Sequence, residues 1–176
     1  MAIDDVQILY TGEFLQTCRR RHWEFVRRVN SSGCAAFVVA TTEDACLLLV
    51  QQFRHPVQAS VIELPAGIVG DQAEGESPAV AAGRELEEET GYRAAELELL
   101  HCSPTAPGLS SEWAYHYRAR QVQRVHSGGG VEDEEILVHR VPLVSAMTWL
   151  AQQQQAGVII DARVYAALAW LSAENA

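Results

Sequence analysis

Three glutamates near the middle of the chain have a spacing that suits a metal site. Glu85, Glu88 and Glu89 are three and four residues apart, so a helix would place their carboxylates within one arc of its surface. Like charges at this spacing weaken an isolated helix. A divalent cation such as Mg²⁺ or Mn²⁺, which prefers oxygen ligands, would offset the repulsion. The alternative is an acidic helix face that is simply solvated.

The residues on either side predict that these glutamates lie on a helix. Ser77 is a good N-cap, Pro78 suits the first helical position, and Gly91 provides a C-terminal stop. Small residues such as Ala82 and Gly83 fall on the face opposite the acids. We therefore expect the backbone of this helix to approach a sheet closely.

The glutamates belong to a longer pattern, G-x5-E-x7-R-E-U-x-E-E-x-G-U, in which U is a bulky apolar residue. Its fixed positions are filled by Gly70, Glu76, Arg84, Glu85, Leu86, Glu88, Glu89, Gly91 and Tyr92. This pattern resembles the Nudix box, the signature of enzymes that hydrolyse nucleoside diphosphates linked to another moiety. The resemblance implies an α/β chain with the Nudix fold, an α/β/α sandwich with a mixed β-sheet, over residues 31–176.

Periodicity along the rest of the chain agrees with a mixed α/β fold. We predict strands at residues 6–16, 23–30, 34–40, 45–50, 62–67, 97–103, 113–124 and 136–141, and helices at 144–154 and after Asp161. The strands at 34–40 and 45–50 are expected to form a buried hairpin. Residues 1–30 form an N-terminal β extension outside the Nudix unit, and the resemblance implies that they pair two subunits of a homodimer.

Composition narrows the class of protein. With 176 residues and 48% hydrophobic content the chain can form one compact domain, and its net charge of −10 argues against a nucleic-acid partner. We see no signal peptide and no apolar run of membrane-spanning length. The four cysteines lack metal-site spacing, so we expect free thiols in a reducing cytoplasm.

The flanks of the box indicate the substrate class by resemblance. Residues 63–67 (ELPAG) and Pro107-Gly108 are similar to ADP-ribose and ADP-sugar pyrophosphatases, whereas residues 128–134 (GGGVEDE) are similar to GDP-mannose hydrolases. We expect a nucleoside diphosphate sugar hydrolase that favours ADP-ribose or an ADP-sugar. Hydrolysis of GDP-mannose or a dinucleoside polyphosphate is the alternative. A non-catalytic ligand sensor is an alternative of another class, opposed by the complete box.

The resemblance also assigns roles in catalysis. Glu85 and Glu89 would bind the metal, with Glu88 shared between them and the carbonyl of Ala66 completing the site. Arg84, one turn before Glu88, would orient the carboxylates of Glu87 and Glu88. In the acidic run after three glycines, Glu132 would be the general base and Glu134 a further metal ligand. A solvated acidic loop is the alternative reading of that run.

Substrate contacts are expected from residues outside the box, between positions 23 and 112. Trp23 would stack on the base, although core packing would also explain it. Arg28 and Arg54 would clamp the diphosphate or the sugar, with surface salt bridges as the alternative. Glu63 of the ELPAG run and Glu112 after Pro107-Gly108 complete the predicted substrate site.

Overall fold

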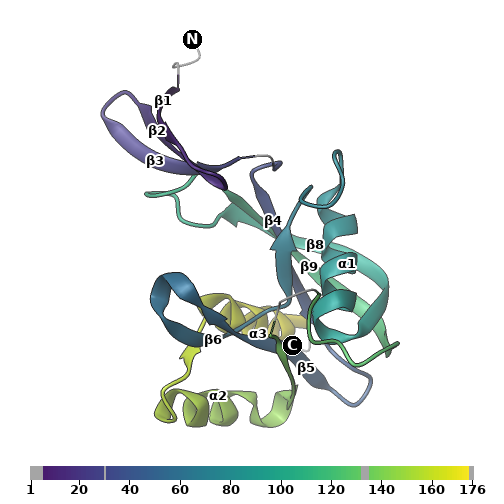
Figure 1. Ribbon diagram of the computed structural model, residues 1–176. Coiled ribbons are helices and arrows are strands. Elements are labelled where there is room, and N and C mark those ends of the chain that lie inside the picture. The colour runs from purple at the N-terminus through teal and green to yellow at the C-terminus, as the bar shows by residue number, and fades with distance from the viewer. Residues whose placement is uncertain (1–5, 30, 132–134, 175–176) are drawn as a thin grey trace.

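Within the described residues, the body of the molecule consists of two four-stranded sheets and three α-helices, and a three-stranded sheet projects from it (Figure 1). The computed structural model describes residues 6–29, 31–131 and 135–174. No helix within these ranges is long and apolar enough to cross a membrane.

The projecting sheet is built from the N-terminal residues. It contains β1 (Gln7–Thr11), β2 (Leu15–Arg20) and β3 (Trp23–Arg28), paired antiparallel in that order. The single strand predicted over 6–16 is wrong, because a turn divides it and Gly12 N–H donates to the carbonyl of Leu15 at 2.8 Å. Two backbone hydrogen bonds of Val26, with Leu109 at 2.8 Å and Ser111 at 3.1 Å, attach β3 to the loop before β9.

The first body sheet has the order β7-β4-β9-β8 and is mixed. Strands β4 (Cys34–Ala40) and β9 (Trp113–Arg124) run parallel, while β7 (Ala66–Ile68) and β8 (Tyr92–Pro104) pair antiparallel with them. The second sheet has the order β10-β5-β6-β11. Its strands are β10 (Leu137–Pro142), β5 (Cys46–Arg54), β6 (Ala59–Glu63) and β11 (Ile159–Ile160).

Two further predictions about the strands are wrong, one about a hairpin and one about the length of a strand. Strands β4 and β5 do not form a hairpin, because they belong to different sheets and a single bridge, Thr41 with Leu47, joins them among the described residues. The strand predicted over 62–67 is divided at Leu64-Pro65 into β6 and β7, which also lie in different sheets. A proline has no N–H for a ladder, so the chain can leave one sheet there and enter the other.

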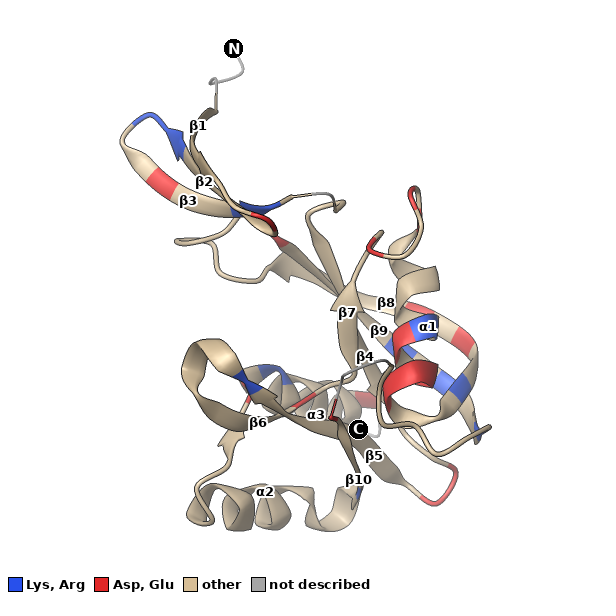
Figure 2. Ribbon diagram, in the orientation of Figure 1, with Lys and Arg blue, Asp and Glu red and all other residues tan. Residues whose placement is uncertain are grey.

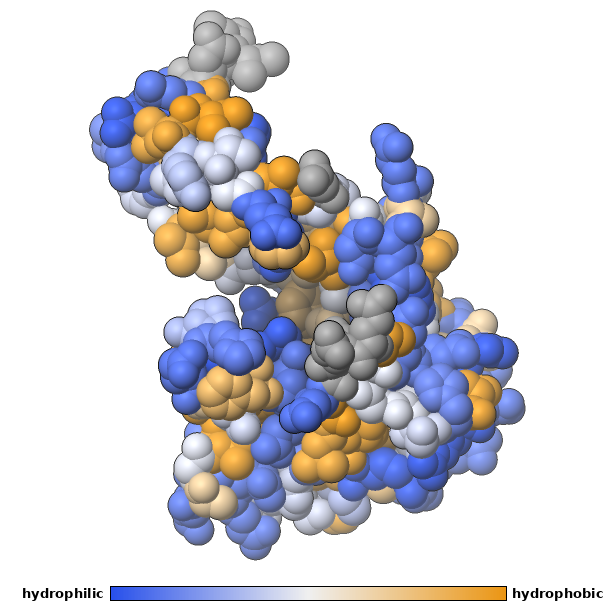
Figure 3. Space-filling view, viewed as in Figure 1, coloured by the Kyte–Doolittle hydropathy of each residue, from blue (hydrophilic) through white to orange (hydrophobic). Residues whose placement is uncertain are grey.

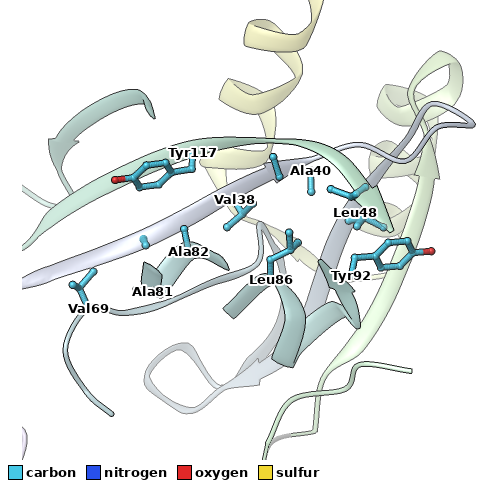
Figure 4. Close-up of a cluster of buried hydrophobic side chains, with 12 residues drawn as sticks. Val38, Ala40, Leu48, Val69, Ala81, Ala82, Leu86, Tyr92 and Tyr117 are labelled. Atoms are coloured by element: carbon cyan, nitrogen blue, oxygen red, sulfur yellow. The ribbon is translucent and has the colours of Figure 1, made fainter. Parts of the chain in front are cut away.

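The helices cover the sheets on two sides. Helix α1 (Pro78–Thr90) packs on the mixed sheet around Val38, Leu86 and Tyr117 (Figure 4). Helices α2 (Ala146–Gln155) and α3 (Ala162–Glu174) pack against a second apolar cluster that includes Ile62. Burying each large apolar side chain contributes about 1.5–3 kcal/mol, so both clusters stabilise the arrangement. The predicted α/β/α sandwich is confirmed.

His116, a residue of β9, is buried where this strand faces α3. His116 is 4% exposed, its ring stacks on Phe37 with a centroid distance of 5.2 Å, and its Nδ1 has no hydrogen-bond partner among the residues that the structure describes. Burial lowers the pKa of His116 to about 4, and the positive charges of Arg163 and His101 add to this effect, while Asp161 opposes it. The imidazole is therefore neutral at physiological pH.

Candidate active site

Helix α1 begins and ends at the residues that the sequence predicts. The Ser77 hydroxyl accepts a hydrogen bond from Val80 N–H at 3.3 Å, and Pro78 is the first helical residue. Gly91 ends the helix with φ at 76°, in the left-handed region, and its N–H donates to the carbonyl of Glu87 at 2.8 Å. These caps fix which residues of the box face β7.

Two of the three box glutamates predicted to bind the metal are buried against β7. Glu85 is 8% exposed and Glu89 is 3% exposed. A carboxylate oxygen of Glu89 accepts a hydrogen bond from Ala66 N–H at 2.9 Å. The Glu85 carboxylate lies against Gly67, where an added Cβ would come within 1.7 Å of its Oε1, so any side chain at this position would displace the carboxylate from β7. The carboxylates of the helix and the backbone of β7 therefore form one site.

Arg84 joins the acidic side chains around the start of this site. Its Nη1 donates to Glu85 at 2.8 Å and to Glu88 at 3.0 Å, while Nε donates to Glu76 at 3.0 Å and Nη2 to Asp71 at 2.9 Å. Figure 2 shows acidic residues gathered on α1 and on the loop that precedes it. One planar guanidinium thus orients four carboxylates, as its fork of donors allows.

One of the two carboxylates predicted to be oriented by Arg84 is not bonded to it. Glu88 is held as expected, but Glu87 points away and forms two hydrogen bonds with Arg93, at 2.6 and 2.7 Å. The pair with Arg93 lowers the pKa of Glu87. Glu85 takes the place predicted for Glu87, because its carboxylate lies next to Gly67 of β7 and within 2.8 Å of Arg84 Nη1.

Electrostatics distinguish Glu85 from the other acids. Burial raises the pKa of Glu85 to about 7, and the charge and hydrogen bond of Arg84 offset this effect only in part. In contrast, the hydrogen bond from Arg84 lowers the pKa of Glu76. Burial disfavours the charge of Arg84 as well, but its bonds to Glu76 and the charge of Glu85 raise its pKa above the ordinary value. A buried carboxylate with incomplete charge compensation fits a site that takes a further cation.

The donor types also fit a divalent cation, although the carboxylates do not meet at one point. Within residues 6–29, 31–131 and 135–174 no three histidine, cysteine or acidic side chains are gathered closely enough to hold a metal ion. Glu85 and Glu88 meet at Arg84, whereas Glu89 contacts Ala66. All are oxygen donors of the kind that Mg²⁺ prefers. Two further predicted residues, Glu132 and Glu134, lie outside the described residues.

The predicted substrate contacts form two ion pairs. Arg28 donates to Glu112, which links β3 to the loop before β9, and Arg54 donates to Glu63 at 2.7 Å across β5 and β6. Each pair is partly exposed. The two arginines therefore lie where a negatively charged ligand can reach them, each next to a carboxylate.

Trp23 lies on the surface and not in the core. It is 54% exposed, and its indole N–H donates to the carbonyl of Gly108 at 3.2 Å, which fixes the orientation of the ring. Trp23, Arg20, Phe25 and Pro107 are among the residues around a hollow of about 540 Å³. Arg20 and Phe25 were not predicted as site residues, because only the fold brings β2 and β3 next to the loop that contains Pro107.

Comparison with known proteins decides the family. The family model described as "NUDIX domain" matches residues 32–167. The chain belongs to the Nudix family. The match begins just after the N-terminal sheet and includes the whole of α1, β7 and the two body sheets. The predicted Nudix fold and the predicted class, a hydrolase acting on phosphoanhydrides, are both confirmed.

Relatives of this Nudix protein carry different names. The methanol dehydrogenase activator of Bacillus methanolicus is 31% identical over 100% of this chain and 86% of its own length. The ADP-ribose pyrophosphatase of Bacillus subtilis is 32% identical over 81% of this chain and 74% of its own length. The GDP-mannose pyrophosphatase of Cronobacter sakazakii is 34% identical over 73% of this chain and 68% of its own length.

A solved structure described as an ADP compounds hydrolase has the same fold. It superposes with a TM-score of 0.71 and covers 97% of this Nudix chain and 93% of its own. The sequence identity is 24%. The N-terminal sheet is therefore part of an arrangement that the two proteins share.

Proposed function

We propose that this Nudix protein hydrolyses the diphosphate of a nucleoside diphosphate sugar to a nucleoside monophosphate and a sugar phosphate. ADP-ribose or an ADP-sugar is the favoured substrate. The observation that carries the proposal is the complete box, folded so that Glu85 and Glu89 are buried against Ala66-Gly67 of the ELPAG run. The names of the Bacillus subtilis and Cronobacter sakazakii relatives agree with this substrate class.

The proposed cofactor is Mg²⁺, with Mn²⁺ as a substitute. Pyrophosphatases of this family generally depend on a divalent metal. Glu85, Glu88 and Glu89 would hold it, together with the carbonyl of Ala66 and the carboxylate of Glu134. When bound, the ion would supply positive charge to the diphosphate and lower the pKa of the attacking water.

The protein's own residues would do the remaining work. The bonds of Arg84 to Asp71 and Glu76 would anchor the helix face, so that Glu85 and Glu88 would be available to hold a cation. We assign the general base to Glu132, which would take a proton from the attacking water. The support for this role is the acidic run that follows three glycines in the sequence.

Substrate binding would use the surface next to the N-terminal sheet. The exposed ring of Trp23 would stack on the base. Arg28 and Arg54 would exchange Glu112 and Glu63 for the oxygens of the diphosphate or of the sugar. Partly exposed ion pairs are typically worth about 0.2–1 kcal/mol, so the exchange costs little. Glu112 and Glu63, once released, could accept hydrogen bonds from sugar hydroxyls.

We propose further that residues 1–30 form the contact of a cytoplasmic homodimer. Ile8 and Tyr10 on β1 and Phe14 in the turn before β2 are 48%, 69% and 71% exposed. Figure 3 shows hydrophobic surface on this sheet. A second subunit that covered these side chains would remove apolar area from water, the main driving force for association.

The second candidate substrate is GDP-mannose. Residues 128–134 and the Cronobacter sakazakii relative favour it over a dinucleoside polyphosphate. The experiment is a comparison of kcat/KM for ADP-ribose, ADP-glucose, GDP-mannose and diadenosine polyphosphates with Mg²⁺. We expect the highest value for ADP-ribose or ADP-glucose. A higher kcat/KM for GDP-mannose would reverse the assignment of the nucleobase. Tight binding of these nucleotides without turnover would favour a ligand sensor.

A further inference from the structure

A glycine-rich segment lies across the C-terminal end of helix α1. Gly129 N–H donates to the carbonyl of Glu89 at 2.8 Å, and Gly130 N–H donates to the carbonyl of Glu88 at 3.1 Å. The last carbonyls of a helix have no partner within the helix and must find one elsewhere. Here the segment supplies donors to two of the residues whose side chains form the candidate metal site.

Where the glycine-rich segment passes the end of α1, the two backbones are so close that neither has room for a side chain. A Cβ at Gly128 would come within 2.3 Å of the carbonyl carbon of Thr90, and a Cβ at Gly91 would come within 2.3 Å of the carbonyl oxygen of His126. These neighbours are backbone atoms and cannot rotate away. Both glycines also have φ in the left-handed region, at 70° and 76°. The close contact therefore requires glycine on both sides.

This contact completes a set of constraints on Glu88 and Glu89. Their side chains are held by Arg84 and by Ala66 N–H, and their carbonyls are held by the segment. The last turn of α1 is thus fixed from two directions relative to β7.

We propose that Gly128–Gly130 is a positioning segment, which holds the backbone of Glu88 and Glu89 at the distance from β7 that metal binding and hydrolysis require. This inference rests on the proposed function and assigns a role to residues beyond the box glutamates. An alanine at Gly128 would have to move backbone from 2.3 Å to at least about 3.0 Å, the closest approach that Cβ atoms show. A shift of about 1 Å in a catalytic group can reduce the rate by about a hundredfold.

The experiment compares Gly128→Ala with a control matched in backbone conformation. Gly33 has φ at 72°, close to the 70° of Gly128, but an added Cβ there meets nothing within 4 Å. Gly33→Ala therefore reproduces the strain of a left-handed alanine without the collision. The readouts are the affinity for Mn²⁺ by isothermal titration calorimetry, kcat and KM, with folding checked by near-UV circular dichroism.

We expect Gly128→Ala to weaken Mn²⁺ binding at least about tenfold and to lower kcat by about a hundredfold with KM within a few-fold. Gly33→Ala should lower only the Tm. Gly91→Ala should behave as Gly128→Ala does, and the double variant should be little worse than either single one, because the first alanine already separates the two backbones.

Wild-type Mn²⁺ affinity and kcat in folded Gly128→Ala would overturn the proposal and leave the segment as a helix cap. If the alanine variants do not fold, hydrogen exchange on the wild-type protein decides the question. The amides of Gly129 and Gly130 should gain protection when Mg²⁺ is added, together with the last turn of α1, and unchanged exchange would contradict the proposal. A wild-type protein that binds no Mn²⁺ would instead contradict the proposed function, and this inference with it.

Discussion

Replacing Glu89 by glutamine removes a charge from the site while keeping the shape of the side chain. Glu89 is 3% exposed, and its carboxylate accepts a hydrogen bond from Ala66 N–H, which the amide oxygen of glutamine can also accept. We therefore expect the fold to be retained. Loss of one preorganised group that stabilises charge in an active site typically costs about a hundredfold to a thousandfold in kcat, which corresponds to about 2.7–4 kcal/mol.

Glu87→Gln is the matched control on the same helix. Its carboxylate is bonded to Arg93 at the surface and lies away from β7. We expect wild-type kcat and a small change in Tm. The assay is the initial rate of nucleoside monophosphate release at saturating Mg²⁺, with thermal melting of each variant. Equal losses of kcat in Glu87→Gln and Glu89→Gln, or full activity in Glu89→Gln, would refute the assignment of the helix face.

Three further outcomes are expected. Arg84→Lys should lower kcat by roughly tenfold or more in steady-state assays, because an ammonium cannot replace the planar fork of donors that orients four carboxylates. As the pH falls from 6.5 to about 4, the free energy of unfolding should decrease by about 1–2 kcal/mol, allowing for solvent screening. The reason is that His116 binds a proton over this range in the unfolded chain but not in the folded protein. Urea denaturation at both pH values should show this loss in wild type and in a variant of exposed His55, but not in His116→Gln. Deleting residues 1–22 should weaken dimerisation in light scattering and raise KM, and an active monomer would contradict the dimer.

Local signals in the sequence are sufficient to predict the limits of α1, the helix that carries the candidate site. Ser77, Pro78 and Gly91 act within α1 or at its ends, so their preferences operate whatever the tertiary structure. The predicted limits of β9, Trp113–Arg124, likewise match the observed ones. The overall α/β/α arrangement was predicted from the family resemblance.

Contacts between distant residues are what the sequence could not predict. Arg28 and Glu112 are 84 residues apart, and no local pattern shows that they pair. The crossing of Gly91 and Gly128 depends in the same way on the path of β9 beyond the helix. Strands β4 and β5 are both buried and apolar, so their composition cannot show that the chain changes sheets between them.

Metal-dependent cleavage of a nucleoside diphosphate sugar by the site at α1 and β7 can be tested directly by ³¹P NMR. ADP-ribose is incubated with protein that has been stripped of metal, and spectra are recorded before and after Mg²⁺ is added. We predict no change without the metal, and AMP with ribose 5-phosphate as the two products once it is present. Cleavage at an undiminished rate in excess chelator, or an intact substrate with Mg²⁺, would contradict the account.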